Sequence, residues 1–260
     1  TVTSVANPLS NNPPGVTVSP SNPDADESSR PDAASHPPPL TLDRTTIASG
    51  AIQNMIRNSG LPIRVLSDAE LEASLDATLA VRPPGAPIWL FAYGSLIWNP
   101  AFHYAEKAKG ELQGWHRQFC LATPLGRGSP DCPGLVLALD KGGHCQGLVY
   151  RIDEAYMEEE LAVVWRREMV TGAYHPHWAE VVIDGARVQA IVFTINPEGP
   201  NYRPHLSEAE VAQCLAKARG QLGSSADYLF RTAHHLEAMG IHDPLLSRLV
   251  ARVNILLATA

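Results

Sequence analysis

Two short segments carry residue types that suit chemistry. The first is Phe91-Ala92-Tyr93-Gly94-Ser95-Leu96, where an apolar run of strand length enters a turn that contains a glycine. A glycine there permits a positive φ and brings consecutive main-chain N–H groups together, which makes a concave donor site for a carboxylate or an oxyanion. An ordinary turn after a strand is the alternative. A serine hydrolase is excluded, because G-x-S-x-G around Ser95 would need glycine where Tyr93 and Ile97 stand.

The second segment is Trp165–Tyr174, at the end of an expected helix. Glu168 lies seven residues after Leu161 and therefore shares the face that the apolar residues turn inward. A carboxylate on such a face is either paired or poised by partial burial for proton transfer. An ion pair with Arg166 or Arg167 is the structural alternative to a catalytic role.

Metal and redox chemistry find little support in the sequence. The four cysteines are read as reduced thiols, because no C-x-x-C pair occurs among Cys120, Cys132, Cys145 and Cys214. The close histidine pairs are His175/His177 and His234/His235, and adjacent helical side chains diverge by about 100°. We expect no metal and no cofactor.

The composition divides the chain into three parts. Residues 1–40 are rich in Pro, Ser, Asn and Asp and predict a disordered tail. Residues 41–86 predict a helical extension, with an apolar stripe over Ile47–Ile56 and a second helix that begins at the capping box of Ser67. Residues 87–260 predict the catalytic domain.

Short apolar runs and turn signals in this last part predict an α+β fold, with a small closed barrel surrounded by helices. We expect hairpins around Asp140–Gly143 and Asp184-Gly185. The expected strands are 88–93, 134–139, 145–152, 179–183 and 188–195, and the expected helices are 153–169, 226–239 and 244–257, with a further helix beginning at a capping box at Ser207.

Charge and hydropathy exclude several classes of partner. A formal charge of -7 with no basic stripe argues against nucleic acid, whose binding depends on clustered Lys and Arg. No run of 18 apolar residues and no secretory signal pattern is present, so we expect a cytoplasmic protein with no membrane partner.

Several separated segments, in the same order along the chain, resemble the ChaC-type, glutathione-specific γ-glutamylcyclotransferases of the bacterial branch. Trp89–Pro100 is similar to the family signature at the end of its first strand, and Gly114–Phe119 to its second strand. Trp165–Tyr174 resembles the segment that bears the catalytic glutamate, and Gly223–Phe230 a C-terminal segment that contributes a tyrosine.

The resemblance implies a γ-glutamylcyclotransferase-like fold and a lyase that converts glutathione to 5-oxoproline and cysteinylglycine, with glutathione or a related γ-glutamyl peptide as its small-molecule partner. It implies that Glu168 is the general acid/base. The residues it implies for substrate binding are Tyr93, Gly94, Ser95 and Leu96, with Arg117 and Tyr228 in support. From the residues alone, Tyr228 equally suits a helix core and Arg117 an ordinary strand position.

Two alternatives remain on the sequence. The first is a cyclotransferase for another γ-glutamyl amine or dipeptide, with the loop Asn196–Tyr202 as a contributor to specificity. The second is a non-catalytic regulatory protein on the same fold, against which the glutamate at position 168 argues, because a binding protein needs no proton shuttle there.

Overall fold

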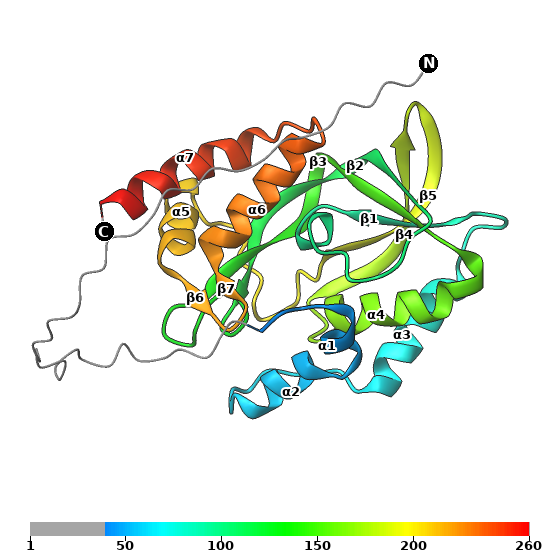
Figure 1. Cartoon of the computed structure of the whole chain (residues 1–260), viewed down its shortest axis with the longest axis horizontal. Helices are drawn as coiled ribbons and strands as arrows, with labels where there is room; N and C mark the ends of the chain where they lie inside the picture. The colour runs from blue at the N-terminus through cyan, green and yellow to red at the C-terminus, as the bar shows by residue number, and fades with distance from the viewer. Residues whose placement is uncertain (1–39, 260) are drawn as a thin grey trace, which may run out of the picture. The chain divides into compact units, whose positions relative to one another are not determined.

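A computed structural model of the chain describes residues 40–259 (Figure 1). The disordered tail expected over residues 1–40 lies, apart from Leu40, outside the described residues. Over the described part of the chain, no helix combines the length and the apolar character that crossing a membrane requires.

Five strands form a closed barrel in the order β1-β3-β2-β4-β5. Their bounds are β1 (Ile88–Ala92), β2 (Glu106–Thr123), β3 (Gly134–Ile152), β4 (Tyr174–Ile183) and β5 (Ala186–Ile195). The barrel is mixed, because β1 pairs antiparallel with β3 and parallel with β5, whereas the other neighbours are antiparallel. The predicted α+β barrel with surrounding helices is confirmed.

Helices flank the barrel, with α5, α6 and α7 along one side and α1 to α4 along another (Figure 1). Their bounds are α1 (Arg44–Ala48), α2 (Ala51–Asn58), α3 (Asp68–Ala80), α4 (Met157–Glu168), α5 (Glu208–Lys217), α6 (Ser225–Ala238) and α7 (Pro244–Ala258). Short elements complete the fold: the 3-10 helices η1 (Ser95–Ile97) and η2 (Glu154–Tyr156) and the strands β6 (Arg219–Gly220) and β7 (Gly223–Ser224). The capping boxes predicted at Ser67 and Ser207 are both present.

One predicted hairpin is wrong. The runs 134–139 and 145–152 are not partners but two parts of the single long strand β3, which pairs with β2 over almost its whole length. Gly142 and Gly143 have positive φ and lie opposite Gly114, so the glycine pair makes a bulge in a continuous ladder. The other hairpin is confirmed, with Asp184 and Gly185 both at positive φ between β4 and β5.

The apolar stripe expected over Ile47–Ile56 is divided between two helices. Gly50, at φ 75°, stands between α1 and α2 and turns the chain. Ile47, Ile52 and Ile56 are nevertheless buried together, in a cluster that also contains residues of α4 and of the connection to β4. The boundary predicted at residue 86 stays a prediction; α1 packs on α4.

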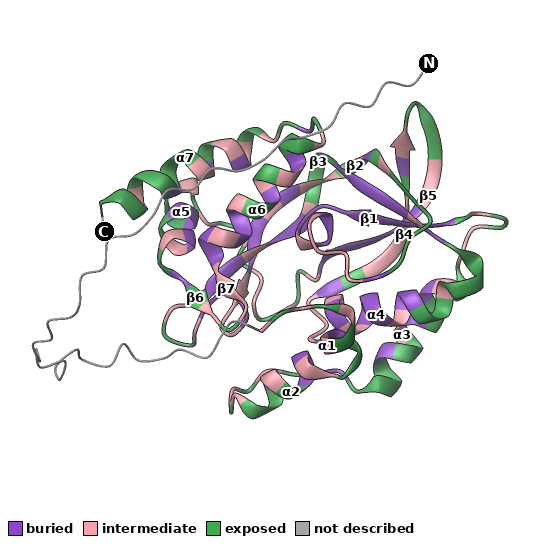
Figure 2. Ribbon diagram, in the orientation of Figure 1, coloured by how far each residue is buried: buried purple, intermediate pink, exposed green. Residues whose placement is uncertain are grey.

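Taken together, the barrel strands are more buried than the helices, whose outward faces are exposed (Figure 2). All five residues of β1 are buried. This rigid strand delivers the bend that follows it to one end of the barrel, where α6 packs against η1 and β3. The end of α4 and the start of β4 reach the same region.

Candidate active site

The bend after β1 presents main-chain donors. Tyr93 and Gly94 leave the strand, and η1 begins at Ser95. The first N–H groups of a helix have no partner within the helix, so those of Ser95 and Leu96 are available to a ligand. Tyr93, Gly94, Ser95 and Leu96 all line a small recess at this end of the barrel, which we call the inner recess.

The expectation of a positive φ at Gly94 is wrong, because its φ is -131°. Glycine is required there for another reason. A Cβ atom at this position would lie 2.7 Å from the hydroxyl oxygen of Tyr228, closer than real Cβ atoms approach a neighbour. The missing side chain therefore lets the bend and the Tyr228 hydroxyl approach each other closely.

Glu168 is the last residue of α4, and its side chain lines the inner recess. Only 13% of the side chain is exposed, and Oε1 lies 3.2 Å from Nε of Arg167. Burial raises the pKa of Glu168, and the adjacent Arg167 partly offsets that rise. The ion pair that the sequence offered as an alternative is thus present, but it leaves the carboxyl group in the recess with a raised pKa.

Arg167 also ties this carboxylate to the bend. Its Nη2 donates to Oγ of Ser95 at 2.8 Å, and its Nη1 donates to the carbonyl of Asn99. One guanidinium therefore connects Glu168 with a bend that lies about seventy positions earlier in the chain. The spatial requirement for joint action of the two segments is met, while the roles of the individual residues stay predictions.

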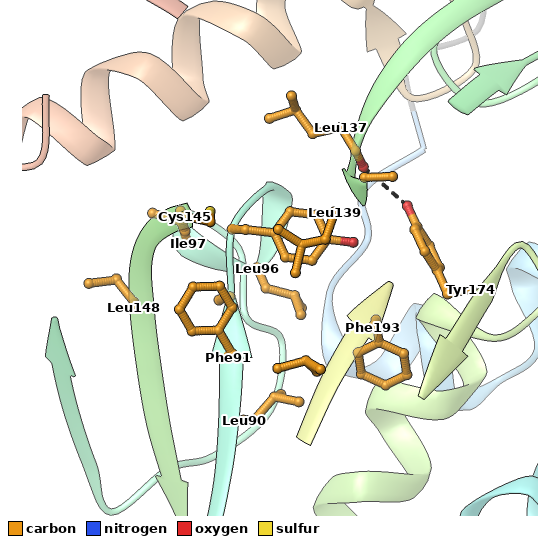
Figure 3. Packing of buried hydrophobic residues seen from close by; sticks show 14 of the residues in the cluster. Leu90, Phe91, Leu96, Ile97, Leu137, Leu139, Cys145, Leu148, Tyr174 and Phe193 are labelled. Carbon is orange, nitrogen blue, oxygen red and sulfur yellow. Dashed lines mark hydrogen bonds between the residues drawn. The ribbon is translucent and has the colours of Figure 1, made fainter. Parts of the chain in front are cut away.

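Three buried tyrosines surround the carboxylate. Tyr174 donates its hydroxyl hydrogen to the carbonyl of Leu137 at 3.3 Å, as Figure 3 shows. The N–H of Leu137 donates to the hydroxyl oxygen of Tyr228 at 3.4 Å, so the phenolic hydrogen of Tyr228 remains able to donate into the recess. Burial raises the pKa of Tyr228 to about 12 and that of Tyr93 well above the usual value, which keeps both phenols neutral.

Arg117 does not line the recess. From β2 it donates to the carbonyl of Tyr93 at 2.6 Å and to that of Gln146 at 2.6 Å, and it pairs with Asp243, the N-cap residue of α7. Its contacts are those of a residue that positions the bend from behind. The predicted contact of Arg117 with the substrate stays a prediction.

The inner recess adjoins a larger cavity of about 410 Å³, which we call the outer cavity. Ser95, Glu168, Tyr174 and Tyr228 line both. Within residues 40–259, no three His, Cys, Asp or Glu side chains converge as metal ligands would.

Sequence reasoning missed two basic side chains of the outer cavity, Arg127 and Arg231, and it named Arg167 only as a partner of Glu168 and not as a residue of the cavity. Arg127 pairs with Asp227 at 3.1 Å and lies over the rings of Trp98 and Tyr228. Arg231 pairs with the same carboxylate and lies over Trp98 from 5.3 Å. The motif Gly126-Arg127-Gly128, an arginine between two glycines in a loop, was the available signal.

The fold alone defines a class of protein. The barrel and its helices are similar to the crystal structure of a γ-glutamyl cyclotransferase specific to glutathione from yeast, with a TM-score of 0.61 and 23% identity, covering 66% of this chain and 97% of that one. The architecture is therefore that of the γ-glutamylcyclotransferase fold.

Sequence comparison shows the family. The family model described as ChaC-like protein matches residues 88–256. A protein of Escherichia coli (strain K12), a glutathione-specific γ-glutamylcyclotransferase, is 46% identical over 187 residues, 72% of this chain and 81% of its own length. A Homo sapiens protein, glutathione-specific γ-glutamylcyclotransferase 1, is 30% identical over 68% of this chain and 83% of its own. The chain belongs to the ChaC-like family.

Proposed function

We propose that the chain is a glutathione-specific γ-glutamylcyclotransferase, a lyase that releases 5-oxoproline and cysteinylglycine. The observation that carries the proposal is the carboxylate of Glu168 in the same recess as the bend Tyr93–Leu96. In a γ-glutamyl peptide the α-amine attacks its own γ-carbonyl and closes a five-membered ring. The reaction therefore needs a proton shuttle and a positioning site, but no protein nucleophile.

Glu168 is proposed as the shuttle. The α-amine is mostly protonated near pH 7, and the leaving nitrogen must gain a proton before its bond to the γ-carbon breaks. One carboxylate takes the first proton and returns it to the leaving amine, which typically contributes about 10²- to 10⁴-fold in rate. Burial supports this role, because a carboxylate with a raised pKa is a stronger base and takes a proton from the α-amine more readily than an exposed carboxylate does.

The bend and Tyr228 are proposed to hold the γ-glutamyl group. The N–H groups of Ser95 and Leu96 suit the substrate carboxylate or the oxyanion of the tetrahedral intermediate, and Tyr228 supplies a neutral hydroxyl donor. These groups hold the flexible γ-glutamyl chain folded, with its amine and carbonyl in contact, and so lower the activation free energy by orienting the reacting atoms in advance. In well-aligned intramolecular reactions this effect reaches about 7 to 11 kcal/mol.

The charges of the outer cavity suit an anionic substrate. Three guanidinium groups, those of Arg127, Arg167 and Arg231, line it together with the carboxylates of Asp227 and Glu168. A γ-glutamyl peptide carries two carboxylates and one ammonium group at neutral pH. The balance of basic groups therefore favours its entry.

A substitution at Glu168 tests the proposal. Glu168→Gln keeps the shape of the side chain and removes the proton shuttle, so 5-oxoproline formation from glutathione should fall by about 10²-fold or more. Glu160→Gln is the matched control, because Glu160 is a buried glutamate of the same helix that pairs with Arg44 outside the cavity. Parent protein that folds but leaves glutathione unchanged would refute the function; a Glu168→Gln variant as fast as the parent would refute the mechanism.

A second candidate is a cyclotransferase for another γ-glutamyl amine or dipeptide. The bend binds the half that all such compounds share, so rates measured with γ-glutamyl dipeptides in competition with glutathione separate the two. A preference for a dipeptide would overturn the glutathione assignment and leave the chemistry intact.

We also propose that the protein acts in the cytoplasm. All four cysteines are free, and burial raises the pKa of Cys120 to about 12 and those of Cys145 and Cys214 to about 11. Thiols kept protonated and unpaired suit a reducing compartment, where reduced glutathione is also maintained. Fractionation of cells that express the protein tests this.

A further inference from the structure

The outer cavity has a wall that the catalytic domain does not supply. Residues before the segment that matches the family model form this side, namely Leu40, Thr41, Leu42, Ile52, Met55, Ile56 and Ile63. We call it the extension wall. Six of these seven side chains are apolar, the exception being Thr41, whereas the end of the cavity at Glu168 is polar and charged.

The extension wall is firmly attached to the rest of the structure. Asn99 donates its Nδ2 hydrogen to the carbonyl of Leu42 at 2.8 Å, and the N–H of Leu66 donates to the carbonyl of Val170 at 2.9 Å. The Arg44 guanidinium pairs with Glu159 and Glu160 of α4. A wall held in this way presents a shaped surface to a ligand.

Apolar side chains from the rest of the chain line the cavity as well. Leu121 and Leu125, at the end of β2 and in the loop after it, face the cavity with Val136 and Leu222. The cavity thus has a polar end, where the γ-glutamyl group is consumed, and an apolar part between the extension wall and the β2–β3 loop. Only the amine half of a substrate can extend from the first into the second.

Glutathione itself has little apolar surface that could contact this apolar part of the cavity. Its amine half is cysteinylglycine, whose thiol is small and whose carboxylate suits the arginines instead. An apolar group attached to the cysteinyl sulfur would remove this apolar surface from water. Met55, half-buried in the extension wall, is an unbranched thioether that adapts to groups of different shape.

We propose that the outer cavity contains a subsite for an apolar substituent on sulfur, so that the chain also cyclises S-substituted glutathiones. The proposal rests on the proposed function. The reaction is the same: the α-nitrogen bonds to the γ-carbon, the bond from that carbon to the cysteinyl nitrogen breaks, and Glu168 carries the proton between the two nitrogens. The carbon–sulfur bond is untouched, and the products are 5-oxoproline and an S-substituted cysteinylglycine.

The test compares glutathione with S-hexylglutathione on one preparation of the full chain, by 5-oxoproline formation. We expect S-hexylglutathione to have a kcat/KM at least equal to that of glutathione, since each fully buried methylene contributes about fourfold. Met55→Gln keeps the length of the side chain but adds a polar amide to the wall. It should lower the S-hexyl to glutathione ratio about three- to tenfold.

Asn54→Gln is the matched control, because Asn54 is the neighbouring exposed residue of α2 and does not line the cavity. The ratio of kcat/KM for S-hexylglutathione to that for glutathione should equal the parent's ratio within about twofold in this control. Because each ratio is taken within one preparation, loss of folded protein cancels. The inference is overturned if glutathione is cyclised while S-hexylglutathione is more than tenfold poorer, or if Met55→Gln leaves the ratio unchanged. Failure with both substrates overturns the proposed function itself.

Discussion

Replacing Gly94 by alanine tests the geometry of the bend in the most quantitative way. The new Cβ would lie 2.7 Å from the hydroxyl oxygen of Tyr228, about 0.7 Å inside the range of ordinary contact. The phenol cannot easily withdraw. Its ring packs edge-on against Trp98 and Phe119, with centroids 6.2 and 6.1 Å away, and its oxygen accepts a hydrogen bond from Leu137.

We expect Gly94→Ala to lower the free energy of unfolding by about 1 to 3 kcal/mol, the usual range for overpacking a core. A shift of the bend by such an amount also moves the N–H groups that we propose bind the substrate, and a misplacement of about 1 Å costs about 10²-fold in rate. Urea denaturation measures the first effect, and 5-oxoproline formation from glutathione the second.

The same Gly94→Ala substitution, made in a protein that also carries Tyr228→Phe, tests whether the Tyr228 hydroxyl causes this loss of stability. Without the hydroxyl oxygen, the atoms nearest to the new Cβ are Leu137 Cβ at 3.8 Å and the ring carbon Cζ at 3.9 Å, both ordinary contacts. Gly94→Ala should therefore cost close to nothing in stability when it is made in the Tyr228→Phe protein. Equal destabilisation in both backgrounds, or none in either, would refute the close approach of Gly94 and Tyr228.

Four further outcomes are expected. Glu168 must be ionised to act as base, and burial raises its pKa above the usual 4.5. The acidic limb of the profile of kcat/KM against pH should therefore lie above pH 4.5. Arg167→Met removes the positive charge that lowers this pKa, so it should move the acidic limb to still higher pH. Because the pKa of Glu168 is higher in the native state than in the unfolded state, the native state loses stability as the pH rises from the unfolded pKa through the native pKa. Glutamine carries no charge to bury, so Glu168→Gln should be at least as stable as the parent at pH 7 by thermal denaturation. Arg117→Met removes the clamp on the bend and leaves Asp243 unpaired, so it should destabilise by about 3 kcal/mol and lower kcat, whereas a substrate ligand would mainly raise KM. Ser67→Ala removes a capping box whose residues do not line the cavity, and it should cost about 1 kcal/mol in urea denaturation with activity unchanged.

Features encoded by neighbouring residues were predictable from the sequence. The capping boxes at Ser67 and Ser207 and the turn at Asp184-Gly185 depend on contacts within four residues, and the structure contains all three. The pair Gly142-Gly143 misled the prediction, because its meaning depends on β2. Only a partner strand with Gly114 opposite converts an apparent turn into a bulge.

The candidate site was likewise only partly predictable, because some of its features depend on neighbouring residues and others on distant ones. The inward face of α4 indicates a buried carboxylate at Glu168, but nothing local indicates that its neighbour Arg167 reaches Ser95. The approach of the Tyr228 hydroxyl to Gly94 also depends on how α6 packs against η1. Arg127 was missed because its position over Trp98 arises only when the loop after β2 folds back on α6.

The central claim is that Glu168 and the bend after β1 act on one bound γ-glutamyl group. A crystal structure of the Glu168→Gln variant with glutathione bound tests it most directly. We predict that the substrate α-amine lies about 3 Å from the side chain at position 168 and that the γ-carbonyl or α-carboxylate accepts hydrogen bonds from the N–H groups of Ser95 and Leu96. A γ-glutamyl group bound with its amine turned away from position 168, or outside the inner recess, would contradict the account.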